Sequence, residues 1–303
     1  MSGTNPREGP NVEACPLCQG ESRPLVSFRS FTVYACTKCG VHFRFPVDQS
    51  DQGDHFTQVR MESYSRSVRV VRERSYRTLV NIVQSYVRTG RWLDVGCSFG
   101  WLLRYVRALG FEPYGVEPSP SAAQTARGGG LRVAIGEYPS VGEEGAPYQV
   151  ISFIDVLEHI SNPFPVLKAA RRHLSPEGVL VVQVPDRECL LYGTALLLFG
   201  ASKGRLGGPL RRLYLDGLDF PHLLYYHHRS LRATLERGGF HVLHEYRAPI
   251  GSLDTTLERV AYLEGPRKGV AANRILALGV GLLQVLDNVC KHGGLLVVIG
   301  RKA

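Results

Sequence analysis

Residues 91–100 have the sequence RWLDVGCSFG, a short apolar run followed by a turn that contains two glycines. The run Trp92–Val95 predicts a buried strand. After the turn, apolar residues recur at helical spacing from Trp101 to Leu109, which predicts a helix. A glycine-rich turn between a strand and a helix lets backbone N–H groups approach a ligand closely. These residues therefore predict a ligand-binding turn at the start of an α/β domain.

A second strand is expected directly after this helix, from Phe111 to Val116, with Glu117 at its end. An acidic side chain at that place can accept hydrogen bonds from both hydroxyls of a ribose. Glu117 follows Asp94 by 23 residues, close to the separation that a strand–helix–strand unit imposes. Because short apolar runs and helical patterns keep alternating beyond this point, we expect an α/β fold with a doubly wound, Rossmann-like sheet.

At this point the chain resembles class I methyltransferases that depend on S-adenosylmethionine (SAM). The segment LDVGCSFG at 93–100 is similar to their first motif, and YGVEPS at 114–119 is similar to their second. The segment DVLEHI at 155–160 and the run from Pro163 to Val182 resemble the fourth and fifth blocks in order and spacing. Four blocks in order are far more specific than one. The resemblance implies the seven-stranded sheet of that class.

The resemblance also implies which residues hold SAM. Gly96, Ser98 and Gly100 would shape the turn around the methionine part, Asp94 would contact its amino group, and Glu117 would hold the ribose. The full set of expected cofactor contacts is Asp94, Gly96, Cys97, Ser98, Gly100, Glu117, Pro118, Glu137 and Asp155. Ser98 replaces a glycine common in the family, and serine is tolerated there where its φ is negative.

Four of the seven cysteines form two closely spaced pairs near the start of the chain. Cys15 and Cys18 are followed, after 17 residues, by Cys36 and Cys39, a spacing typical of a four-cysteine zinc site. The intervening residues 24–35 alternate as in a hairpin, so we expect a small zinc ribbon. Two disulfides are the alternative, which a reducing compartment disfavours. Four thiolates leave no open position on the ion, so zinc would stabilise the fold.

Composition and length favour one large domain and a small module. The 303 residues are 44% hydrophobic and carry a net charge of +9. We expect a zinc ribbon at 1–48, an Arg-rich helical linker at 49–90 and a methyltransferase domain at 91–303, with lid insertions at about 186–228 and 248–294. The polar first ten residues and the absence of an apolar run of about 18 residues predict a cytoplasmic protein without a transmembrane span.

Residues 60–88 contain seven arginines and two glutamates, with apolar residues along one helical face. We expect the arginines to form the solvated side of this helix. Contact with the phosphates of a nucleic acid is the alternative interpretation.

Two histidines are the candidate proton acceptors for methyl transfer. His159 directly follows the expected fourth strand. His222 lies in the segment DFPHLLYY at 219–226, which resembles a His-containing segment of related methyltransferases. Some related quinone O-methyltransferases bind a divalent ion through an acid-x-x-Glu-His group, so Mg²⁺ at Asp155, Glu158 and His159 is a second interpretation. Capping of the following helix is the third.

The leading hypothesis is a SAM-dependent transfer of a methyl group to oxygen or carbon of a small molecule such as a sugar, a quinone or another secondary metabolite. An RNA base methyltransferase is the alternative, since a zinc ribbon before this fold also occurs in a ribosomal RNA family. A non-catalytic SAM-fold binding module is the alternative from another class. The apolar run 275–286 could lie on a membrane surface or at a homodimer interface.

Overall fold

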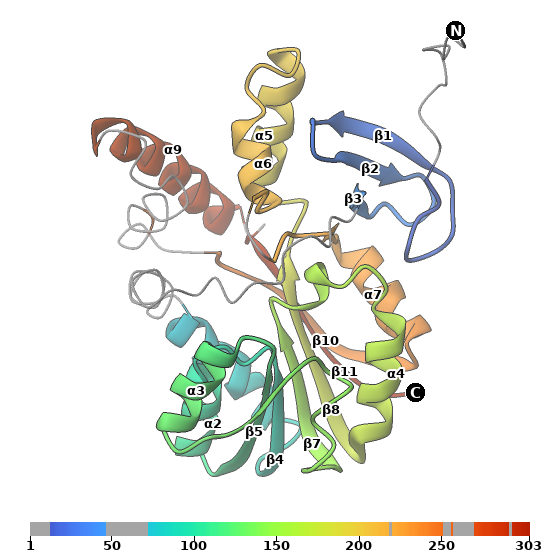
Figure 1. The fold of residues 1–303 in the computed structure, drawn as a ribbon, viewed down its shortest axis with the longest axis vertical. Coiled ribbons are helices and arrows are strands. Elements are labelled where there is room, and N and C mark those ends of the chain that lie inside the picture. Colours follow the sequence, from blue (N-terminus) through green and yellow to red (C-terminus); the bar gives the residue numbers. More distant parts are fainter. Residues whose placement is uncertain (1–12, 47–71, 218–219, 251–255, 257–269, 291–292) are drawn as a thin grey trace, which may run out of the picture.

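The computed structural model describes residues 13–46, 72–217, 220–250, 256, 270–290 and 293–303. Within them, seven strands form a central sheet in the order β10-β11-β8-β7-β4-β5-β6 (Figure 1). These strands are β4 (Gly90–Val95), β5 (Phe111–Glu117), β6 (Arg132–Ile135), β7 (Tyr148–Ile154), β8 (Leu174–Pro185), β10 (Phe240–Ala248) and β11 (Leu295–Lys302). Strands β4 to β8 are parallel, whereas β11 is antiparallel to both β8 and β10. The predicted doubly wound sheet is confirmed.

Helices cover both faces of this sheet, which explains why its strands are nearly continuous apolar runs. A helix over residues 72–84 and α2 (Trp101–Ala108) pack on one face, where Trp92 is fully buried. Helices α4 (Phe164–His173) and α7 (His228–Arg237) pack on the other face. Helix α3 (Pro120–Gly128) packs beside β6 at one edge (Figure 1).

The order of the strands reverses at β4, which lies between β5 and β7. In an open parallel sheet, ligands bind outside the carboxyl ends of the strands at such a reversal. The turn that follows β4 lies at this point, so the fold places the predicted SAM-binding residues at the position where a ligand is expected.

A second sheet has four strands in the order β1-β2-β3-β9. Its first three strands are β1 (Ser22–Ser27), β2 (Thr32–Cys36) and β3 (His42–Phe45). Strands β1 and β2 pair antiparallel, as the alternation between the cysteine pairs predicts. The fourth strand, β9 (Leu224–Tyr225), comes from far along the chain and pairs with β3. The cysteine-bearing module is therefore joined to the rest of the protein by backbone hydrogen bonds.

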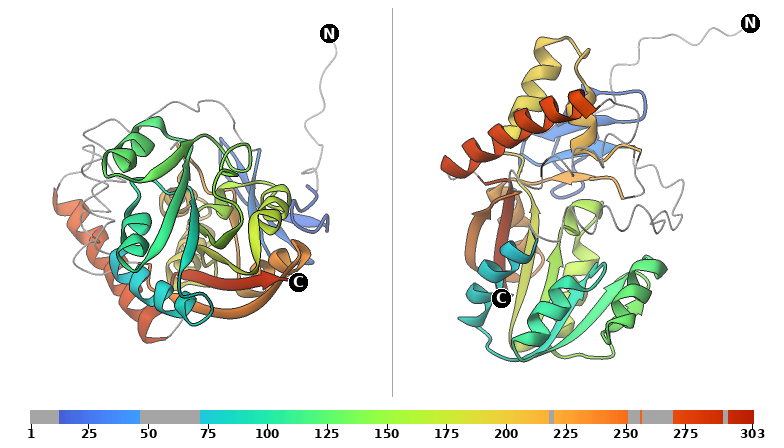
Figure 2. Two further views of the ribbon diagram at one scale, coloured as in Figure 1. Left: turned by 90° about the horizontal axis from the view of Figure 1, so that it is seen from below. Right: turned by 90° about the vertical axis from the view of Figure 1, so that its left-hand side faces the viewer.

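Three further helices lie together beyond the carboxyl ends of the strands (Figures 1 and 2). They are α5 (Leu190–Ala201), α6 (Gly208–Leu213) and α9 (Val270–Val289). Both α5 and α6 belong to the first predicted lid insertion, and α9 belongs to the second. Parts of two predicted elements, residues 60–71 of the Arg-rich helix and 251–255 and 257–269 of the second insertion, lie outside the described residues. Among the described helices, none combines the length and apolarity needed to cross a bilayer.

Candidate functional site

The turn after β4 is a tight bend held against β5. The backbone N–H of Gly96 donates to the carbonyl of Val116 at 2.8 Å. Gly96 and Gly100 have φ values of 71° and 72°, in the left-handed region that favours glycine. A Cβ atom at Gly100 would lie 2.4 Å from the Cδ1 of Leu131, so that leucine would have to shift to admit a side chain. The turn therefore needs both glycines for its shape.

Glu117, at the end of β5, lies directly beside this turn. Its Oε2 accepts a hydrogen bond from the backbone N–H of Ser98 at 2.7 Å, and its Oε1 accepts one from Ser119 at 2.9 Å. The turn and the acid are therefore close enough to contact one adenosine-bearing molecule. Ser98 has a φ of 48°, which differs from the negative value at which serine is tolerated best. This left-handed conformation costs about 1 kcal/mol in a residue other than glycine.

Asp94 is buried at the carboxyl end of β4. Its Oδ1 accepts a hydrogen bond from the hydroxyl of Ser152 at 2.6 Å, and the indole of Trp92 donates to the same hydroxyl at 2.9 Å. Burial raises the pKa of Asp94 to about 7, although the Ser152 hydrogen bond and the nearby charge of Arg72 lower it. A cationic group next to this carboxyl would compensate for the lost hydration of its charged form.

Asp155 follows β7 and is held by two side chains. The guanidinium of Arg72 contacts its Oδ2 at 2.8 Å, and the amide of Gln183 donates to its Oδ1 at 3.0 Å. The expectation that the arginines of this helix are solvated is wrong for Arg72, whose side chain is only 21% exposed. It holds for Arg74 and Arg77, which are exposed. Composition alone does not distinguish Arg72 from its neighbours.

The other predicted cofactor residues differ in where their side chains lie. Cys97 is buried behind the turn in a cluster with Leu103 and Val133, and its thiol donates to the carbonyl of Ser98 at 3.8 Å. Pro118 and Glu137 are exposed at the carboxyl edge of the sheet, after β5 and β6. These positions do not test whether Cys97, Pro118 and Glu137 contact the cofactor, so all three contacts stay predictions.

His159 and His222, the two candidate proton acceptors, lie against each other with their ring centres 5.0 Å apart. The Nδ1 of His159 donates to the carbonyl of Pro221 at 3.0 Å, and the Nδ1 of His222 donates to the carbonyl of Leu213 at 2.7 Å. Since a carbonyl oxygen only accepts, each Nδ1 carries the hydrogen and each Nε2 keeps a lone pair. Burial and the neighbouring His159 lower the pKa of His222 to about 3, so the ring is neutral.

Glu158 completes this cluster. Its side chain is fully buried, no described residue forms a hydrogen bond with its carboxyl oxygens, and burial holds its pKa well above the usual range. One side-chain atom from each of Glu158, His159 and His222 lies within 4.8 Å of the others. The predicted Mg²⁺ group of Asp155, Glu158 and His159 finds no support, because Asp155 is engaged by Arg72 instead and His222 takes its place in the cluster.

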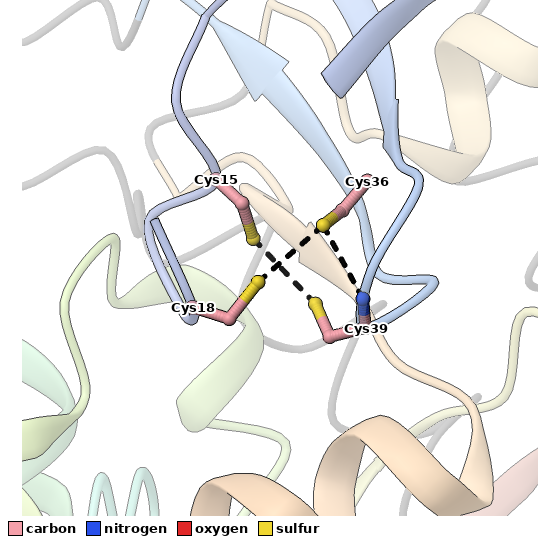
Figure 3. Close-up of side chains that lie close together, drawn as sticks. All are labelled: Cys15, Cys18, Cys36 and Cys39. Atoms are coloured by element: carbon pink, nitrogen blue, oxygen red, sulfur yellow. Dashed lines mark hydrogen bonds between the residues drawn. The ribbon is translucent and has the colours of Figure 1, made fainter. Parts of the chain in front are cut away.

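The sulfur atoms of the four paired cysteines point toward one centre (Figure 3). Sγ of Cys15 lies 3.6 Å from Sγ of Cys39, and Sγ of Cys18 lies 3.5 Å from Sγ of Cys36. None of these cysteines forms a disulfide. Thiolates arranged as a tetrahedron with Zn–S bonds of about 2.3 Å are separated by roughly 3.8 Å, so the four residues fit a zinc ion. The predicted ribbon arrangement is confirmed.

Comparison with known proteins agrees with this fold. The methyltransferase domain family matches residues 64–245, more than half of the chain. The chain therefore belongs to the methyltransferase domain family.

Among curated relatives, the chain is 32% identical over 119 residues to a ubiquinone biosynthesis O-methyltransferase of Caulobacter sp. (strain K31), covering 37% of this chain and 46% of that protein. It is 26% identical over 113 residues to the ubiquinone biosynthesis O-methyltransferase of Azorhizobium caulinodans, covering 35% and 45%. The chain thus spans about half the length of the curated relatives it matches.

Solved structures share the fold at low sequence identity. A chain from the complex between the Trm112 methyltransferase activator of Haloferax volcanii and a methyltransferase is 14% identical, with 80% of this chain and 96% of that one covered and a TM-score of 0.53. The cyclopropane synthase MmaA2 from Mycobacterium tuberculosis is 15% identical, with 74% and 84% covered and a TM-score of 0.50. These likenesses concern the fold alone.

Proposed function

We propose that the chain is a SAM-dependent methyltransferase that transfers a methyl group to oxygen or carbon of a small molecule. One observation carries the proposal: Glu117 accepts hydrogen bonds from Ser98 and Ser119 beside the glycine turn, next to buried Asp94. Two carboxyl groups at the ends of neighbouring strands, at the point where the strand order reverses, suit the ribose and the amino group of one cofactor.

Different residues around the turn would contact different parts of the cofactor. The carboxylate of Asp94 suits the amino group of SAM, and the guanidinium of Arg72 suits its carboxylate, because each pairs opposite charges in a partly buried site. When bound, SAM supplies an electrophilic methyl group. Cys97, Pro118, Glu137 and Asp155 are proposed as further contacts, from the turn and from the ends of the adjacent strands.

The histidine cluster would serve the methyl acceptor. Each of His159 and His222 has its Nδ1–H fixed on a carbonyl, so that the lone pair of Nε2 can accept a hydrogen bond from the methyl acceptor. Both histidines are only partly exposed, and Tyr225 packs against His222 with ring centres 5.6 Å apart, so the pair lies in a confined setting that favours a small molecule over a polynucleotide. The curated relatives are named ubiquinone biosynthesis O-methyltransferases, which supports oxygen as the atom that receives the methyl group.

Zinc is proposed as a structural ion held by Cys15, Cys18, Cys36 and Cys39. A closed set of four thiolates has no position left for water or substrate, so the ion would act on folding and not on the reaction.

Transfer of labelled methyl from SAM to fractionated cell extract tests the proposed function. We expect label in the small-molecule fraction, unaffected by prior treatment with RNase, and calorimetric binding of SAM by the zinc-loaded protein. Label confined to RNA would show that the acceptor is a nucleic acid. A folded protein that neither binds SAM nor transfers label would be a non-catalytic module.

Affinity for SAM is expected to rise with pH through about 7. A bound ammonium group favours the ionised form of Asp94, so binding releases the proton that the buried carboxyl holds below its pKa of about 7. Affinity should fall by up to tenfold for each pH unit below that value and level off above it. Calorimetric titrations between about pH 5.5 and 7.5, where the amino group of SAM stays protonated, measure the effect. Asp94→Asn should abolish this slope, and a flat profile in the parent protein would contradict the assignment.

A further inference from the structure

Helix α9 exposes five large apolar side chains and buries two of its polar ones, Gln284 and Asp287. The exposed fractions of Leu278, Leu282 and Val289 are 72%, 60% and 72%, and Val285 and Leu286 are 38% and 41% exposed. These positions recur at helical spacing, so they form one continuous stripe. A helix that only covered the protein core would turn this stripe inward.

Polar contacts on the opposite side hold α9 in this orientation. Asp287 is 1% exposed, and its Oδ1 accepts a hydrogen bond at 2.7 Å from the backbone N–H of Leu190, the first residue of α5. Gln284, which is 5% exposed, accepts a hydrogen bond from the hydroxyl of Thr256 at 2.8 Å. Turning the leucines inward would break both contacts and leave the N–H of Leu190 and the hydroxyl of Thr256 without their acceptors. The exposed stripe is therefore a fixed feature of the fold.

The helices next to α9 add apolar and basic side chains to the same end of the molecule. Leu197 and Leu206, on α5 and in the turn after it, are 70% and 52% exposed. Segments 190–216 and 270–289 together carry five basic residues and two acidic ones, the buried Asp287 and Asp216, whose 7% exposed side chain pairs with Arg211. The basic residues are Lys203, Arg205, Arg211, Arg212 and Arg274. Figure 2 shows that α5, α6 and α9 lie together, beyond the sheet.

We propose that this surface, formed by α5, α6 and α9, binds the headgroup region of a bilayer that contains anionic phospholipid. Within the described residues of these helices, the surface combines an apolar stripe with basic side chains and has no exposed acid, which is the combination that interfacial helices use. The charge decides between the two candidate partners, a membrane and a second copy of the chain. Two positively charged copies of this surface would repel each other, whereas an anionic bilayer attracts it. This inference goes beyond the proposed methyl transfer and does not depend on it.

Flotation with vesicles tests the proposal on the full, zinc-loaded chain. We expect the protein to float with vesicles made of equal parts of phosphatidylcholine and phosphatidylglycerol, to bind phosphatidylcholine alone more weakly, and to be released by salt. The double variant Leu278→Ser, Leu282→Ser should bind the anionic vesicles at least about tenfold more weakly. Leu109→Ser, at the end of α2 and 40% exposed, is the matched control and should bind like the parent.

Equal flotation of the double variant and the parent would overturn the proposal. A parent that ignores vesicles but forms a dimer, which the double variant loses in light scattering, would also overturn it and assign the surface to a second copy. SAM binding, measured on the same variant, should be unchanged because both leucines lie outside the cofactor site. Loss of vesicle binding with intact SAM binding thus separates this surface from the proposed enzymatic function.

Discussion

Replacement of Glu117 by alanine is expected to weaken SAM binding by about 100-fold. Two hydrogen bonds from ribose hydroxyls to a carboxylate contribute about 1.5 kcal/mol each, which corresponds to this loss. The truncation also leaves the N–H groups of Ser98 and Ser119 without their acceptor, which loosens the glycine turn. Calorimetric titration of the purified variant with SAM, together with its thermal unfolding, measures both effects.

Two variants separate recognition of the ribose from support of the turn. Glu117→Gln keeps one hydrogen-bond acceptor and the shape of the side chain, so it should bind SAM with intermediate affinity. Glu112→Gln changes an exposed acid at the opposite end of the same strand and should bind like the parent. If Glu117→Ala folded normally and retained full affinity, the ribose would have to be held elsewhere and the proposed site would be wrong.

The fold and the cofactor side of the site could be predicted from sequence because they depend on local patterns. A strand, a turn with Gly96 and Gly100, and a helix follow one another within a few residues, and Glu117 ends the next strand. Strands that run parallel bring their carboxyl ends to one edge of a sheet, so Asp94 and Glu117 had to lie near each other. The chain order of the elements was sufficient for this inference.

Contacts between distant segments could not be predicted in the same way. Arg72 lies among six similar arginines, and its contact with Asp155 depends on how the helix over 72–84 packs across the end of the sheet. The meeting of His159 with His222 likewise depends on a loop 62 residues further along the chain, which returns to place Pro221 on His159. The spacing of apolar residues indicates which side of a helix is buried. It does not indicate which distant residue a polar side chain at the edge of that side contacts.

The cysteine spacing predicted a zinc ribbon but not its attachment to the candidate acceptor site. Strand β9 hydrogen-bonds to β3, pairing Tyr225 with His42. Just before it, the backbone N–H of Leu223 donates to the carbonyl of Glu158 at 2.7 Å. His222 directly precedes both attachments in the chain. A two-residue strand carries too little sequence signal to be recognised, so only the structure shows that the ribbon supports this histidine.

Loss of the metal is accordingly expected to expose His222 as well as to destabilise the chain. Cys36→Ser removes one of four thiolates, and a closed zinc site contributes about 10 kcal/mol or more to the folding of small modules. Even half of that value lowers the melting temperature of a chain of this size by about 10 °C. Once β3 unfolds, β9 loses its partner, and His222 becomes accessible to diethylpyrocarbonate. Zinc content, calorimetry and mapping of the modified histidine by mass spectrometry measure the three effects.

The matched control is Cys290→Ser, which removes an exposed thiol outside the cluster and should change none of the three measurements. Binding of SAM provides a further contrast, because Asp94 and Glu117 lie on the central sheet and contact no part of the ribbon sheet in the described structure. The variant should therefore retain SAM binding below its lowered melting temperature. If His222 stayed protected after complete loss of zinc, the zinc ribbon would not position this histidine. The pairing of β3 with β9 would then contribute to stability alone.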